Sequence, residues 1–205
     1  MKKSGTAKSW HNGADAEMKL YARSLQKAAL SLARALEPQP STGTPWDVCP
    51  IIWLYRQALE LQLKGLVGEG SNFLKSKTDP ISLYSTHSLR WLAQIVCQVI
   101  KTVGWERDFA CEGVSNLTDF NSLVNEVESL EPVSCAVHFA NTRDHNSVAL
   151  TFQKINAVEF AKKLGALLEL LEVTADALAA TWDRRAEEAV EGDLGGGNDF
   201  GPTIH

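Results

Sequence analysis

Apolar residues recur along most of the chain every three or four positions, which is the spacing that gives an α-helix one apolar face. Prolines, glycines and short polar stretches separate these segments from one another. The pattern predicts helices over about residues 15–37, 47–67, 88–104, 119–131 and 155–188. Because helices dominate, we expect an all-α fold, a helical bundle of about four or five helices around one core.

Three segments depart from this pattern. Residues 133–152 contain two β-rich runs, SCAVHFA and SVALTF, on either side of NTRDHN, and these predict a short extended or β-hairpin-like insert before the long last helix. Residues 1–13 are polar and residues 189–205 are rich in glycine, so we expect both ends to be flexible. A single helical domain is therefore predicted over residues 14–188.

Composition and charge narrow the class of protein. A chain of 205 residues with 44% hydrophobic residues can bury one sizeable core, which fits a single domain. Its net charge of −5 gives no overall attraction to nucleic acid, although it is compatible with a local basic patch. The N-terminus lacks the apolar stretch of a signal peptide, and no apolar run reaches the roughly 18 residues of a membrane span. We therefore expect a cytoplasmic protein with no membrane contact.

Metal-binding residue types occur in the predicted insert. The four cysteines of the chain are far apart and form no C-x-x-C pair, which is typical of reduced thiols. Cys135, His138 and His145 lie close together in sequence, but Cys135 and His138 face opposite sides of a strand, and the sequence suggests no fourth ligand. We therefore predict no metal site and no cofactor, and the role of these three residues stays open.

A ladder of charges runs through the most apolar predicted helix. The segment IIWLYRQALELQLKGL carries Arg56, Glu60 and Lys64 four positions apart, and we call these three residues the polar ladder. A helix this apolar is normally central in its bundle, and buried charges need partners. The ladder either satisfies itself through i,i+4 pairs at the edge of a groove, or lines a polar pocket or interface that other parts of the fold complete.

Two residues from elsewhere are candidates to complete such a site. His87 precedes the third predicted helix and either caps it or acts as a titrating group, because imidazole changes charge near neutral pH. Arg143, in the insert, is either a turn residue or forms, with His145, a cationic lip for phosphate. The candidate binding cluster therefore comprises Arg56, Glu60, Lys64, His87 and Arg143.

The same residues carry a family resemblance. PIIWLYRQALELQLKGL, then THSLRWL, then VHFANTRDHNSVALTF before a long last helix, resembles the pattern of HEPN-like α-helical domain proteins of bacteria, over roughly residues 47–172. The resemblance implies a helical bundle that forms a homodimer and acts in stress or defence. It further implies either a metal-independent ribonuclease or an inactive module that binds RNA or a partner protein. The matching positions are Tyr55, Arg56, Glu60, Lys64, His87 and Leu89.

The chain departs from the catalytic members of that family. Those members carry an Arg followed a few residues later by a His, whereas Arg143 and His145 are too close together and no other Arg–His pair fits. The resemblance therefore favours a non-catalytic binding or interaction module. The alternative is a metal-independent ribonuclease with a non-standard site, in which His87 is the general acid or base and Arg56 or Arg143 stabilises the developing charge. A purely structural subunit of a complex is a third interpretation.

Overall fold

The structure of the protein is a computed structural model that describes residues 7–36, 45–74, 80–130 and 155–194. Over these residues the chain is almost entirely helical, which confirms the prediction of an all-α protein for this part of the chain. Across the same ranges, no helix is apolar over a stretch long enough to cross a membrane. The α-helices are α1 (Ala7–Leu36), α2 (Cys49–Gly70), α3 (Pro80–Ser85), α4 (Leu89–Val103), α5 (Leu117–Ser129) and α8 (Ala157–Leu194), and two 3₁₀ helices, η1 (Pro45–Val48) and η2 (Ser71–Phe73), flank α2.

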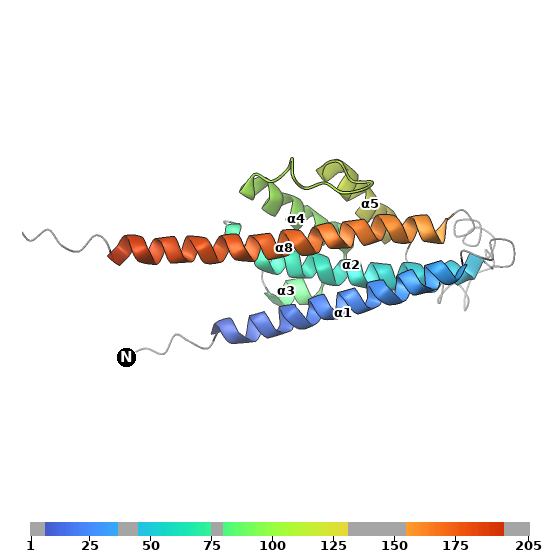
Figure 1. Cartoon of the computed structure of the whole chain (residues 1–205), viewed down its shortest axis with the longest axis horizontal. Helices are drawn as coiled ribbons and strands as arrows, with labels where there is room; N and C mark the ends of the chain where they lie inside the picture. The colour runs from blue at the N-terminus through green and yellow to red at the C-terminus, as the bar shows by residue number, and fades with distance from the viewer. Residues whose placement is uncertain (1–6, 37–44, 75–79, 131–154, 195–205) are drawn as a thin grey trace, which may run out of the picture.

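Helix α2 lies at the centre of the fold, between α1 and α8, and also packs on α4, which in turn carries α5 (Figure 1). Its position follows from its sequence, because a helix that is apolar around most of its circumference buries most surface when it is surrounded. Tyr55 of α2 is fully buried and meets Phe160 of α8 edge-on, with ring centroids 6.0 Å apart. At Gly70 the backbone of α2 approaches α4 so closely that an added Cβ would lie 2.7 Å from the Val99 side chain.

Local capping chemistry sets the ends of the shorter helices. The Ser88 side chain accepts a hydrogen bond from the Trp91 backbone N–H and caps the start of α4. Gly104 ends the same helix with a φ of 84°, a left-handed conformation that glycine adopts without strain. The Asn116 side chain caps α5 by accepting hydrogen bonds from the backbone N–H groups of Thr118 and Asp119.

The first and last helices extend beyond their predicted limits of about residues 15 and 188. Helix α1 begins at Ala7, inside the predicted flexible segment 1–13, and α8 continues to Leu194, inside the predicted tail 189–205. Helix α1 runs through Gly13, and one glycine within a helix costs only about 1 kcal/mol relative to alanine. The predicted insert over residues 133–152 lies outside the described residues. The short helix α3 was not predicted.

Candidate functional site

The polar ladder lies on the buried central helix. Arg56 is 9% exposed, Glu60 4% and Lys64 5%, although each carries a formal charge. Charged side chains are almost never buried to this degree unless they are paired. The i,i+4 pairs expected of a self-satisfying ladder are present, Arg56 with Glu60 and Lys64 with Glu60, but both pairs are buried within the fold.

Glu60 is the carboxylate on which both cations of the ladder converge. Lys64 Nζ donates a hydrogen bond to Glu60 Oε1 at 2.8 Å. Arg56 Nη1 donates to Glu60 Oε2 at 3.4 Å, which is long for such a bond and therefore weaker. The i,i+4 spacing places all three side chains on neighbouring turns of α2, so the helix itself supplies this geometry.

Both cations also reach across to the backbone that joins α3 to α4. Lys64 Nζ donates to the carbonyl oxygen of Tyr84 at 3.2 Å, and Arg56 Nη2 donates to that of His87 at 3.0 Å. Tyr84 lies in the last turn of α3, where backbone carbonyls have no partner within the helix. The polar ladder thus fastens the α3–α4 connection to the central helix.

His87 forms the exposed side of this arrangement. Its side chain is 74% exposed, and its Nδ1 lies 2.9 Å from Glu60 Oε1. A carboxylate oxygen accepts hydrogen bonds, so His87 Nδ1–H is the donor in this contact. The expectation that His87 caps the third predicted helix was wrong, because the neighbouring Ser88 supplies the capping oxygen instead.

The cluster carries more positive than negative charge. Arg56 and Lys64 face one carboxylate, Glu60, and the two backbone carbonyls supply the remaining acceptors. Within the described residues, the buried Nε of Arg56 has no hydrogen-bond partner. The buried amide oxygen of Gln62, six residues further along α2, also has no partner within them. Each such group raises the energy of the fold by about 1–3 kcal/mol unless water reaches it.

The structure brings four of the five predicted cluster residues together, and the fifth lies outside the described residues. Arg56, Glu60, Lys64 and His87 form one connected hydrogen-bonded set. Arg143 lies outside the described residues, as do the other insert residues considered as metal ligands: Cys135, His138 and His145. Among the residues that are described, no three His, Cys, Asp or Glu side chains gather as a metal site requires.

Sequence reasoning missed the two backbone acceptors and the buried Gln62. The carbonyls of Tyr84 and His87 leave no trace in the residue types of those positions, since every residue carries one. Gln62 did carry a signal, because it is a polar residue on the apolar side of α2, where it is 2% exposed.

This arrangement is suited to two roles. A buried set of bonds between α2 and the α3–α4 connection can hold the helices in one arrangement. An exposed imidazole that donates to a buried carboxylate can also accept a proton at Nε2, as a general base does. No protein-family model matches the chain, and the comparisons with curated proteins and with solved structures also found no match.

Proposed function

We propose that this protein is a HEPN-like interaction module without catalytic activity, which forms a homodimer and contacts a further partner in a stress or defence setting. The family resemblance of the sequence supports the class of domain and the setting. The contacts of the polar ladder support the non-catalytic role.

The observation that carries the proposal is how the ladder cations are used. Lys64 Nζ donates to a backbone carbonyl in the last turn of α3 and Arg56 Nη2 to one in the α3–α4 connection, and both side chains also donate to Glu60. A cation that stabilises the transition state of phosphodiester cleavage has to present its donors to the substrate. Here the donors are directed into the fold, which suits a structural ladder better than a catalytic one.

Charge favours a protein over RNA as the further partner. The net charge of the chain is −5, and binding of nucleic acid depends mainly on cations that neutralise phosphates. Several exposed cations are also paired within the fold: Arg23 with Glu172, Lys162 with Glu112 and Arg90 with Glu128. RNA as the partner is the alternative to a protein partner, and RNA binding by the chain is measured directly in the test below.

The test is a pair of assays on the full-length protein in the presence of a metal chelator. We expect no cleavage of single-stranded RNA by the wild type, and no binding of the same RNA by fluorescence anisotropy at physiological salt. The His87→Ala variant should behave identically in both assays. RNA cleavage that the wild type performs and folded His87→Ala does not would refute the non-catalytic role.

The alternative function is a metal-independent ribonuclease, and one observation favours it. His87 combines a ring that is 74% exposed with an Nδ1 that lies 2.9 Å from a buried carboxylate, and Nε2 is the ring nitrogen that this contact does not use. In this alternative Glu60 would be a positioning residue, and Arg56 or Arg143 would stabilise the developing charge. Glu60→Gln should then lower the cleavage rate and shift its pH profile, whereas a purely structural carboxylate would leave the profile in place.

A further inference from the structure

His87 turns one ring nitrogen toward the fold and the other toward solvent. Nδ1 lies 2.9 Å from Oε1 of Glu60, whose side chain is 5% exposed, whereas the His87 side chain is 74% exposed. In any histidine Nδ1 is the ring nitrogen nearer the backbone, and Nε2 is at the outer end of the ring. The exposed part of this side chain is therefore the part that carries Nε2.

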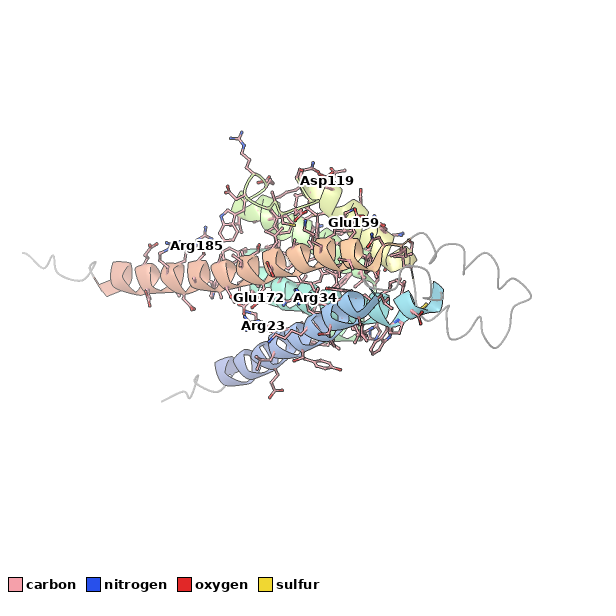
Figure 2. The ribbon with its side chains drawn as sticks, turned by 45° about the vertical axis from the view of Figure 1, so that its right-hand side comes forward. Arg23, Arg34, Asp119, Glu159, Glu172 and Arg185 are labelled. Atoms are coloured by element: carbon pink, nitrogen blue, oxygen red, sulfur yellow. The ribbon has the colours of Figure 1, made fainter. Side chains whose placement is uncertain are left out.

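The second nitrogen sets this contact apart from the ion pairs elsewhere on the surface. Arg23 of α1 and Glu172 of α8, for example, point toward one another from the two helices (Figure 2). Lysine and arginine carry all their protons at neutral pH, so they have no lone pair with which to attack an electrophile. Imidazole loses a proton near neutral pH. In neutral His87 with its Nδ1–H donated to Glu60, the lone pair is on the exposed Nε2.

Glu60 is held in a position that supports such a nucleophile. Lys64 Nζ donates to its Oε1 at 2.8 Å, and Arg56 Nη1 donates to its Oε2 at 3.4 Å. A carboxylate that accepts a hydrogen bond from one imidazole nitrogen fixes the orientation of the ring and makes the other nitrogen more basic. It also stabilises the positive charge that the ring gains when that nitrogen attacks, as the aspartate of a serine protease triad does for its histidine. Glu60 is therefore a positioning residue for His87.

The surrounding charge favours an anionic electrophile. Two cations of the polar ladder, Arg56 and Lys64, face the single carboxylate of Glu60. These charges are buried, so water and salt screen them less than charges on the surface. Glu128 of α5 reaches the N-terminal cap of α4, but it is paired there with Arg90. A phosphoryl group, with its anionic oxygens, therefore approaches His87 against an excess of positive charge.

We propose that His87 is a phosphorylation site, at which Nε2 takes a phosphoryl group from a donor of the phosphoramidate class. The Nε2 lone pair forms the new N–P bond, the P–N bond of the donor breaks, and the protonated donor nitrogen leaves as the free amine. Nδ1 keeps its proton, and the positive charge on the ring faces Glu60. The product adds negative charge at an exposed position, as regulatory phosphorylation does. This inference goes beyond the proposed function, because it requires neither RNA cleavage nor a partner protein.

The first test treats the full-length wild type with potassium phosphoramidate and locates the product by tandem mass spectrometry at neutral or alkaline pH. The other histidines of the chain serve as internal controls: His11, His138, His145 and His205. We expect His87 to react faster than any of them, and phosphorus NMR should show the Nε2 isomer. In urea, where the fold and the contact with Glu60 are lost, the five histidines should react at similar rates.

The second test removes the charge of Glu60 and keeps the volume of its side chain. Glu60→Gln should lower the rate at His87 about tenfold, the order of effect that losing a carboxylate partner has on a functional histidine. It should also raise the share of the Nδ1 isomer, because the ring is held less firmly, and a merely structural role of Glu60 would leave that share unchanged. The matched control is Glu112→Gln, which removes the carboxylate of an exposed pair with Lys162 and should change neither quantity.

Each outcome supports or overturns the inference. Reaction at His87 that is no faster than at the other histidines of the folded wild type overturns it, and so does a product mainly at Nδ1. A folded Glu60→Gln variant with the wild-type rate and isomer also overturns it, because the carboxylate then does not prepare the ring. The proposed function fails separately, since RNA cleavage that depends on His87 refutes the non-catalytic role whether or not His87 accepts a phosphoryl group.

Discussion

Removing the Glu60 carboxylate should destabilise the fold far more than losing a surface ion pair. Glu60→Ala removes the carboxylate that Arg56 and Lys64 share. Of their acceptors described above, only the backbone carbonyls of His87 and Tyr84 then remain, and both cations stay buried in α2. Breaking a buried ion pair by removing one partner costs about 3–5 kcal/mol, and this is the loss expected in the free energy of unfolding. The lost contact with His87 adds little, because that side chain is largely exposed.

Urea unfolding followed by circular dichroism measures this loss. With a slope of about 2 kcal/mol per molar urea, the unfolding midpoint should fall by about 2 M. Protein concentration has to be held constant, because the apparent stability of any chain that self-associates depends on it. The control is Lys163→Ala, which removes another i,i+4 pair, that between Lys163 and Glu159 on the exposed surface of α8. It should cost no more than a few tenths of a kcal/mol.

A second variant separates buried charge from simple loss of packing. The triple substitution Arg56→Met, Glu60→Leu and Lys64→Met removes every charge of the polar ladder while keeping similar volume, so no ion is left unpaired. It should be more stable than Glu60→Ala alone. The reasoning is refuted if Glu60→Ala stays within about 0.5 kcal/mol of the wild type, or if the triple variant is the less stable of the two.

Three further substitutions test other parts of the structure. Gly70→Ala should lower stability by about 1–3 kcal/mol in urea unfolding, because its Cβ would lie 2.7 Å from Val99. Ser88→Ala should cost about 1 kcal/mol in the same assay, because it removes the cap on the Trp91 N–H; a loss below a few tenths would contradict the assigned cap. Burial raises the pKa of Tyr55 from 10.0 to about 12, so folding favours its neutral form. Wild-type stability should therefore fall between about pH 10 and pH 12 more steeply than that of Tyr55→Phe, which cannot ionise; parallel curves would refute this.

Helices with one strong apolar pattern were predictable from sequence. The start of α1 and the end of α8 were not. α2 and α4 both match their predicted ranges closely, because apolar spacing, Pro50 and Gly104 mark their limits. The start of α1 at Ala7 was missed because it depends on a balance between a glycine and several good helix formers. The helix propensities involved differ by only about 1 kcal/mol, and a pattern of residue types does not show which side of so small a difference the chain adopts.

The candidate site was predictable in its residues and not in its bonds. Four-residue spacing indicated that Arg56, Glu60 and Lys64 would lie together, but it left open whether they lie at a groove edge or inside the fold, where the structure places them. The sequence could not show that two of them bind backbone carbonyls, because such acceptors are independent of residue type. It also could not show whether His87 caps α4, since Ser88 next to it is the better capping residue.

The polar ladder also fixes how α2 is rotated about its own axis. Apolar residues cover most of the circumference of α2, so hydrophobic burial alone distinguishes poorly between one rotation of this helix and another. A shift by one residue would turn the helix by about 100° and carry both cations away from the carbonyls of Tyr84 and His87. Alternative packings of similar apolar area would then leave two buried ions without acceptors. The charges on α2 thus select one arrangement of the surrounding helices.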